Sequence, residues 1–179
     1  SNKKERRRTQ SINNAFALPE IEDFEKAIDE KTKAILICNP NNPTGAVYSK
    51  ETLTELAILC QKKDVFLFVD EVYSAFCYDE IPFYSTLNIE SCLQNIAVVD
   101  SVSKRYSACG ARIGNIVTKN KSLLAAINKY AQFRLSAPTM GQIFAEALLD
   151  VPASYLEETK AEYERRRNVL FQRLQQMQD

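Results

Sequence analysis

The stretch AILICNPNNPTG, residues 34–45, joins a short apolar run to a loop-forming sequence. The run Ala34–Cys38 has the length and composition of a strand that a parallel sheet buries on both faces. The NPNNPTG that follows holds two prolines and a glycine, and neither a strand nor a helix continues through such a sequence. The stretch therefore predicts a buried strand that ends abruptly in a polar loop.

The next segment has the pattern of an amphipathic helix followed by a second buried strand. Ser49 is placed to cap a helix, and apolar residues recur behind it at helical spacing: Leu53, Leu56, Ala57 and Cys60. We expect a helix over residues 49–63 and a strand at VFLFV, residues 65–69. The order strand, helix, strand favours an α/β domain with right-handed crossovers.

The same alternation continues along the chain. Ile96–Val99 is predicted as a third strand and Ile113–Val117 as a fourth. Further helices are expected at Pro19–Glu30 and at residues 120–133, 139–149 and 154–178. The predicted fold is a three-layer α/β architecture, with a mostly parallel sheet and helices on both faces.

Each of the first three predicted strands ends in polar residues. Asn39–Thr44 follow the first strand, Asp70 and Tyr73 the second, and Ser101–Lys104 the third. Ligands of open α/β sheets bind at the carboxyl ends of the strands. We therefore expect these polar groups to face one rim of the sheet.

Arg112 tests the direction of the fourth strand. It lies at the beginning of that strand and reaches the same rim only if the strand runs antiparallel to the others. The connection from Val99 to Arg112 contains no convincing crossover helix. The sequence thus predicts an antiparallel strand at one edge of the sheet.

Composition argues against several classes of partner. The chain has 179 residues, with 23 basic and 23 acidic side chains, so it has no net positive field to attract nucleic acid or anionic lipid. The basic cluster Lys3–Arg8 is expected to be a solvated terminus. No apolar run approaches the roughly 20 residues of a membrane span, and no leader pattern precedes the first polar segment. A cytoplasmic protein is expected.

Missing residue types narrow the chemistry further. Without histidine, the chain cannot build Ser-His, Cys-His or His-ligated metal sites, so no metal centre is expected and acid–base work falls to Lys, Tyr, Asp or Glu. Four glycines cannot supply GxGxxG or the GxxxxGK[ST] phosphate loop at the positions where they occur. The five cysteines occur singly, which argues against a disulfide framework.

The groups at the predicted rim suit a phosphorylated heteroaromatic aldehyde. Lysine condenses with an aldehyde, and arginine and hydroxyl groups bind phosphate. A carboxylate beside a ring nitrogen keeps it protonated, which makes the ring an electron sink. Taken singly, these residues also have ordinary roles: Asp70 as a cap, Tyr73 as packing, Asn42 as a turn former, and Lys104 and Arg112 as solvated surface. Their joint occurrence at one rim favours the chemical interpretation.

Three blocks of the sequence resemble the signature motifs of one family, the fold-type I pyridoxal-phosphate enzymes of class I/II, which include aspartate aminotransferase. The blocks are NPNNPTG at 39–45, DEVY at 70–73 and SVSKRYSACGARIG at 101–114. They occur in the family's order with compatible gaps, and the resemblance extends from about Pro19 to Asp179. It implies pyridoxal 5'-phosphate (PLP) as the cofactor.

The resemblance also implies a role for each catalytic candidate. Lys104 would bind the aldehyde carbon of PLP, and Asp70 would pair with the pyridine nitrogen. Asn42 and Tyr73 would hydrogen-bond the 3-hydroxyl oxygen of the ring. The implied reaction is transamination, in which Lys104, desolvated in the rim, takes the α-proton of an amino acid, whose amino group is later passed to a 2-oxo acid.

The phosphate of PLP would be bound by Ser101 and Arg112, with Ser103 as a helper. Gly110 and Gly114 flank Arg112, where we expect a sharp backbone turn close to the cofactor. Ala111 departs from the bulky aromatic residue common there in the family, without removing a catalytic group.

The resemblance further implies that the chain is part of a longer subunit. Residues 1–150 would be a partial cofactor-binding large domain, and residues 151–179 a connector helix toward a small domain that is absent. Such a fragment is expected to be inactive or weakly active alone, and the intact protein to be a homodimer. Two alternatives share the cofactor site: another PLP enzyme, such as a decarboxylase or lyase, and the sensor domain of an aminotransferase-like transcription regulator.

Overall fold

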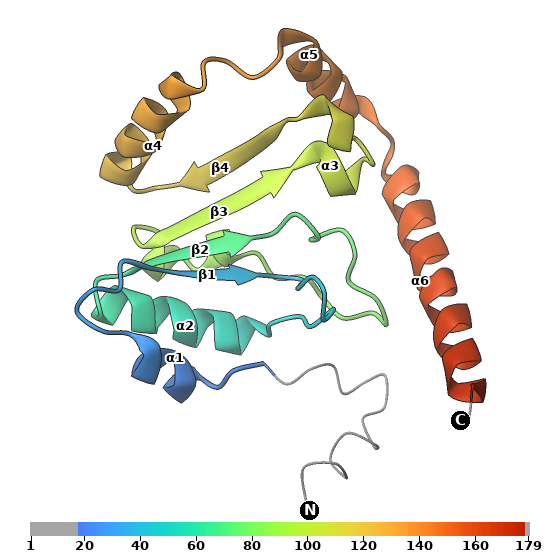
Figure 1. Cartoon of the computed structure of the whole chain (residues 1–179), viewed down its shortest axis with the longest axis horizontal. Helices are drawn as coiled ribbons and strands as arrows, with labels where there is room; N and C mark the ends of the chain where they lie inside the picture. The colour runs from blue at the N-terminus through green and yellow to red at the C-terminus, as the bar shows by residue number, and fades with distance from the viewer. Residues whose placement is uncertain (1–17, 178–179) are drawn as a thin grey trace, which may run out of the picture.

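The computed structural model describes residues 18–177, which form a four-stranded sheet with associated helices (Figure 1). The expected solvated terminus, Lys3–Arg8, lies outside the described residues. The strands are β1 (Ala34–Cys38), β2 (Phe66–Asp70), β3 (Ile96–Ser101) and β4 (Gly114–Thr118). The α-helices are α1 (Ile21–Ala27), α2 (Lys50–Lys62), α3 (Val102–Arg105), α4 (Lys121–Phe133), α5 (Thr139–Ala147) and α6 (Ala153–Gln176). Single 3-10 turns occur at η2 (Thr86–Asn88), η3 (Glu90–Cys92), η4 (Cys109–Ala111) and η5 (Leu148–Asp150).

The sheet is mixed, and its strands lie in the order β1-β2-β3-β4. β1, β2 and β3 run parallel, and β4 runs antiparallel to β3. The predicted mixed α/β sheet with an antiparallel edge strand is therefore confirmed. Cys38 pairs with Asp70, and Ser101 pairs with Gly114, so the carboxyl ends of the parallel strands and the beginning of β4 share one edge.

Helix α2 covers one face of this sheet and forms the centre of the core. Ser49 caps the helix as predicted, since its side chain accepts a hydrogen bond from the backbone N–H of Thr52 at 3.1 Å. Leu53 and Leu56 are fully buried and pack in one cluster with Leu67. Burial of each such leucine stabilises the fold by roughly 1.5–3 kcal/mol.

The opposite face of the sheet is less completely covered by the described residues. Side chains alternate between the two faces of a strand, so Leu36 and Phe68 lie opposite the α2 side. Leu36 is 72% exposed, whereas Ile37 beside it in β1 is 6% exposed. Further large apolar side chains are exposed on α4, α5 and the turn between them: Tyr130, Phe133, Leu135, Met140, Ile143 and Phe144.

Element boundaries differ from the sequence prediction at a few places. Helix α1 ends at Ala27 rather than at Glu30, because the Asp29 carboxylate accepts hydrogen bonds from the backbone N–H groups of Lys31 and Thr32 and forms a turn instead. β2 is shifted by one residue to Phe66–Asp70, and β3 runs on to Ser101.

Helix α6 runs beyond the carboxyl edge of the parallel strands (Figure 1). It is the longest described helix, and mostly polar. Within residues 18–177, no helix combines the length and apolar character that crossing a membrane requires.

Candidate functional site

The carboxyl edge of the sheet places Asp70 at the end of β2, opposite Cys38 of β1. The Asp70 side chain is partly exposed, and its Oδ1 accepts a hydrogen bond from the backbone N–H of Val72 at 3.0 Å. Its other oxygen has no hydrogen-bond partner among the described residues. The Cys38 thiol donates to the carbonyl of Pro40 at 3.2 Å, and burial, with the nearby Asp70 charge as a smaller cause, raises the pKa of this thiol.

Asn42 and Tyr73 meet directly above this edge. The Nδ2 of Asn42 donates a hydrogen bond to the Oη of Tyr73 at 3.0 Å, although the two residues are 31 positions apart. The Nζ of Lys104 lies 5.8 Å from the centroid of the Tyr73 ring. Three of the predicted residues are thus brought together from the segments that follow β1, β2 and β3.

Lys104 lies on the short helix α3 and is exposed. No carboxylate within residues 18–177 forms an ion pair with it. The expectation of a lysine desolvated at the rim is therefore wrong for the described residues, because the Lys104 side chain is exposed. Its amine is accessible from solvent.

Ser101 and Ser103 lie at the junction of β3 and α3. The Ser101 side chain caps α3 by accepting a hydrogen bond from the backbone N–H of Ser103 at 3.2 Å. Arg112 reaches the same edge, because the backbone N–H of Val102 donates to the carbonyl of Ile113. Its exposed guanidinium donates to the carbonyl of Cys109 at 3.0 Å, however, and makes no hydrogen bond to either serine. Arg112 thus shares the edge with Ser101 and Ser103 without a hydrogen bond to either.

The two glycines that flank Arg112 are expected to make a sharp backbone turn possible. The structure differs from this expectation. Arg112 itself is left-handed, with φ at 56°, a conformation that costs a non-glycine residue roughly 1–2 kcal/mol. A Cβ at Gly110 would meet no atom within 4 Å, so that glycine is not required by packing. Gly114 lies in a tighter place, since a Cβ there would lie 3.0 Å from the carbonyl oxygen of Asp100.

Sequence reasoning missed the residue beside Lys104. Arg105 donates at 2.8 Å to both the Oδ2 of Asp100 and the Oγ of Ser74, and so joins the end of β3 to the loop after β2. The opposite charges five positions apart in DSVSKR are the only signal that pointed to this pair. The bond to Ser74 holds the residue next to Tyr73.

Two buried polar residues flank the site and were also missed. Glu71 is 5% exposed and accepts hydrogen bonds from the backbone and the hydroxyl of Thr86, at 2.9 and 3.0 Å. Asn39 is fully buried, and its Oδ1 accepts from the backbone of Tyr48, whereas its Nδ2 has no partner among the described residues. Both residues hold the loops that carry Tyr73 and Asn42.

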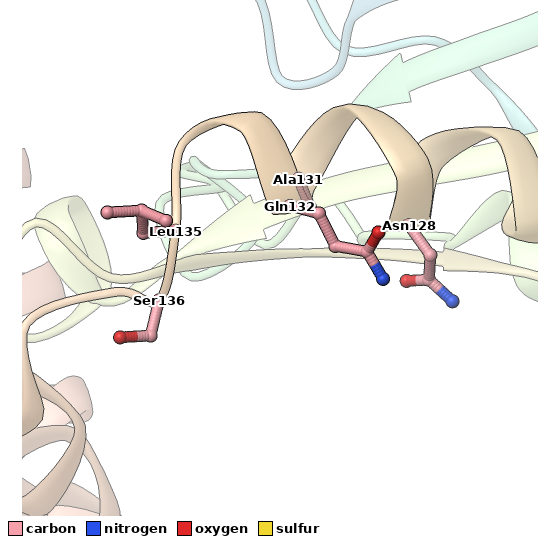
Figure 2. A pocket seen from close by; sticks show the side chains of 5 residues that line it. All are labelled: Asn128, Ala131, Gln132, Leu135 and Ser136. Atoms are coloured by element: carbon pink, nitrogen blue, oxygen red, sulfur yellow. The ribbon is translucent and has the colours of Figure 1, made fainter.

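Two hollows are found on the described surface. One, of about 700 Å³, adjoins the site and combines the apolar Leu36, Phe68 and Val99 with Cys38 and Asp70. The other, of about 670 Å³, lies at the end of α4, with its lining side chains drawn in Figure 2: Asn128, Ala131, Gln132, Leu135 and Ser136. The second is lined by no titratable side chain, whereas the first contains Asp70 and Cys38.

The chain is similar to known proteins over nearly its whole length. Residues 12–179 match the model of the family described as aminotransferase class I and II. The chain is 33% identical over 170 residues to the aromatic-amino-acid aminotransferase 2 of Thermococcus litoralis, covering 92% of this chain and 42% of that protein. It is 32% identical over 167 residues to the aspartate aminotransferase of Pyrococcus abyssi, again covering 92% and 42%.

A solved structure supports the same relationship. The aspartate aminotransferase of Thermus thermophilus with maleate superposes with a TM-score of 0.79 at 30% identity, over 87% of this chain and 41% of that one. The chain therefore spans about two fifths of the length of these relatives. By sequence and by fold, it belongs to the class I and II aminotransferase family.

Proposed function

We propose that this chain carries the lysine half of a PLP site in an aminotransferase, which transfers an amino group between an amino acid and a 2-oxo acid. The observation that carries the proposal is the meeting of Asn42, Tyr73 and Lys104 at the sheet edge that also holds Asp70. The two named relatives and the solved neighbour are all aminotransferases, which favours transamination over decarboxylation or elimination.

The residues present fit the chemistry of PLP. The Asn42 amide and the Tyr73 hydroxyl are adjacent, 3.0 Å apart, so a phenolate oxygen placed beside both groups would accept a hydrogen bond from each. Asp70 keeps one carboxylate oxygen without a described partner, which is available to a protonated pyridine nitrogen. The exposed amine of Lys104 can condense with the aldehyde.

When bound, PLP supplies an electron sink that stabilises negative charge at the α-carbon of an amino acid. Lys104 then has the role of moving a proton at that carbon through its Nζ. Asp70 maintains the charge of the ring nitrogen, and Tyr73 and Asn42 orient the ring. Residues that exclude water from Lys104 are expected to come from outside the described chain.

Phosphate binding is proposed for Ser101, Ser103 and Arg112. The Ser101 hydroxyl accepts a hydrogen bond in capping α3, and its own proton stays available to a phosphate oxygen. Arg112 would exchange its hydrogen bond to the Cys109 carbonyl for a charge-assisted bond to phosphate.

The wider context of the site is proposed as well. Residues 1–150 would belong to a cofactor-binding large domain and residues 151–179 to a connector helix, within a homodimeric enzyme of amino acid metabolism. We place that enzyme in the cytoplasm, because the five cysteines, three of them buried, are all free, as in reducing compartments.

A labelling experiment tests the proposal. The chain is incubated with PLP and reduced with borohydride, which makes the bond between the lysine nitrogen and the aldehyde carbon permanent, and the modified peptide is identified by mass spectrometry. We expect the label on Lys104, its loss in Lys104→Arg, and its retention in Lys119→Arg, which changes an exposed lysine at the opposite edge of the sheet. Labelling spread evenly over exposed lysines, or absent from Lys104, would refute the proposed site.

A further inference from the structure

The segment from Glu71 to Glu80, which carries Tyr73, begins with two overlapping turns. The backbone N–H of Ser74 donates to the carbonyl of Glu71, and that of Phe76 donates to the carbonyl of Tyr73, both at 2.8 Å. The position of Tyr73 is thus linked to that of Phe76. We call Glu71–Glu80 the tyrosine loop.

The far end of the tyrosine loop is strained. Asp79 and Glu80 both adopt left-handed backbone conformations, with φ at 56° and 58°. Each non-glycine residue in this region costs roughly 1–2 kcal/mol. Such a conformation persists only where contacts from elsewhere hold it.

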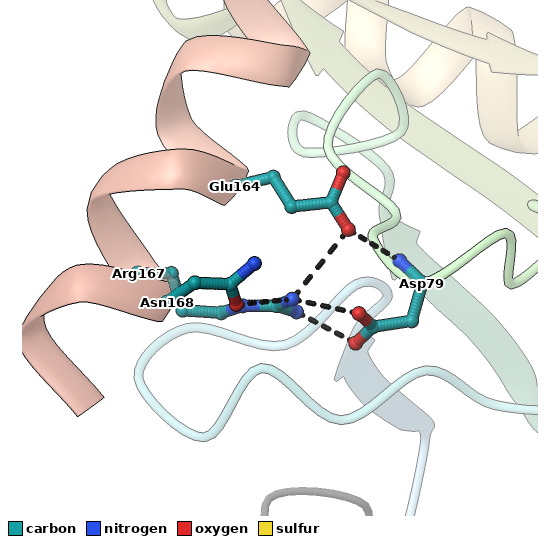
Figure 3. A network of polar contacts seen from close by, with 4 residues as sticks. All are labelled: Asp79, Glu164, Arg167 and Asn168. Atoms are coloured by element: carbon teal, nitrogen blue, oxygen red, sulfur yellow. Dashed lines mark hydrogen bonds and ion pairs between the residues drawn. The ribbon is translucent and has the colours of Figure 1, made fainter. Parts of the chain in front are cut away.

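Helix α6 supplies those contacts, as Figure 3 shows. Arg167 donates from both terminal nitrogens to the two carboxylate oxygens of Asp79, at 2.7 Å each. Glu164, one turn earlier, accepts the backbone N–H of Asp79 at 2.8 Å. The guanidinium also lies 5.1 Å from the centroid of the Tyr78 ring. Side chain, backbone and neighbouring ring of the strained turn are all bound to the same helix.

A second contact joins α6 to the middle of the tyrosine loop. The ring of Tyr163 packs edge to face on the ring of Phe76, with centroids 5.6 Å apart. Tyr163 and Arg167 are four positions apart and therefore lie on one side of α6. Since Phe76 is hydrogen-bonded to Tyr73, the contacts of α6 reach the residue that meets Asn42.

We propose that Arg167 is a positioning residue for the cofactor site, which acts through Asp79 to hold the tyrosine loop and thereby Tyr73. The role of Tyr73 toward PLP rests on the proposed function. Arg167 itself touches none of the residues at the sheet edge. Two parallel hydrogen bonds from the guanidinium fix the orientation of the Asp79 carboxylate as well as its distance from α6. A single ammonium group cannot do this.

The pair is exposed enough that its loss leaves the fold intact. The side chains of Arg167 and Asp79 are 28% and 47% exposed, and ion pairs at such sites contribute at most about 1 kcal/mol to stability. Arg167→Met is therefore expected to fold. The matched control is Arg165→Met, which removes an arginine of the same helix whose ion pair, with Glu162, stays within α6.

Two measurements test the role. The first is amide hydrogen exchange across the tyrosine loop without cofactor, and the second is the dissociation constant of PLP. We expect Arg167→Met to speed exchange of the amides of residues 73–79 at least threefold and to weaken PLP binding about fivefold, the effect of one lost hydrogen bond. Arg167→Lys should give exchange rates and a PLP affinity between those of wild type and Arg167→Met. The exchanged pair, Arg167→Asp with Asp79→Arg, should restore much of the slow exchange and much of the PLP affinity.

The outcomes separate this role from the proposed function. Unchanged exchange and PLP affinity in Arg167→Met, or equal changes in Arg165→Met, would overturn the positioning role. Faster exchange without any change in PLP affinity would overturn it too, since Arg167 would then be merely structural. A wild-type chain that takes up no PLP refutes the proposed function instead, and the exchange rates alone then decide whether Arg167 holds the loop.

Discussion

The substitution Tyr73→Phe separates two contributions that one side chain makes to the candidate site. The hydroxyl lies 3.0 Å from the Asn42 amide, and the ring lies 5.8 Å from the Lys104 amine. Phenylalanine removes the hydrogen bond to Asn42 and keeps the ring beside Lys104. The change therefore tests whether the hydroxyl binds the cofactor.

The structure sets the expected size of the effect. The bond between Asn42 and Tyr73 is exposed, so water replaces the lost partner and the free energy of unfolding should fall by less than about 1 kcal/mol. In the PLP-bound chain, the Tyr73 hydroxyl would instead donate a hydrogen bond to the 3-hydroxyl oxygen of the PLP ring. Loss of one such bond, at about 1 kcal/mol, should weaken PLP binding about fivefold.

The assay is a PLP titration followed by absorbance of the bound cofactor, with urea unfolding in parallel. Tyr130→Phe is the matched control, because Tyr130 is 76% exposed on α4 and has no contact with the site. Asn42→Ala combined with Tyr73→Phe should cost less than the sum of the two single changes if both groups bind one oxygen. An affinity equal to wild type in Tyr73→Phe, or an equal loss in Tyr130→Phe, would refute the reasoning.

Two further predictions concern the core and the thiols. Leu56→Ala should lower the free energy of unfolding by about 2–5 kcal/mol, because Leu56 is fully buried. Leu36 is 72% exposed, so Leu36→Ala should lower it by less than about 1 kcal/mol. Equal losses in urea unfolding would contradict the assignment of the covered face. Iodoacetamide at pH 8 should label the exposed Cys109 and spare Cys60 in the folded chain. Burial raises the pKa of the Cys60 thiol to about 12 and leaves it protonated. Early modification of Cys60, detected by mass spectrometry, would count against this.

Local signals predicted most of the sheet and one helix cap. The apolar run Ala34–Cys38 is β1 to the residue, and Ser49 caps α2 as expected. The reversal of β4 followed from the short connection between Val99 and Arg112, which leaves no room for a crossover helix. Each of these inferences needed only neighbouring residues, and for that reason they succeeded.

Local sequence patterns do not predict contacts between distant segments. Asp79 and Arg167 are 88 positions apart, and no spacing rule links an aspartate in a loop to one arginine among the three in ERRR. The sharp turn near Arg112 was expected from its glycine neighbours, because glycine is the usual signal for such a turn, but Arg112 itself takes the left-handed conformation. The meeting of Asn42 with Tyr73 was predicted only through the family's motifs, since a position on one rim does not fix a hydrogen bond.

The alternation of side chains along the strands connects the partial exposure of Asp70 to the uncovered face of the sheet. Asp70 lies on the same face as Phe68, and Cys38 on the same face as Leu36, because they are two positions apart in their strands. That face is the one on which Leu36 is 72% exposed, while α2 seals the other. A layer that packed on Leu36 and Phe68 would at the same time shield Asp70 from water and strengthen its interaction with a charged ring nitrogen. The apolar face and the polar edge are therefore two parts of one surface, and whatever covers the first sets the electrostatics of the second.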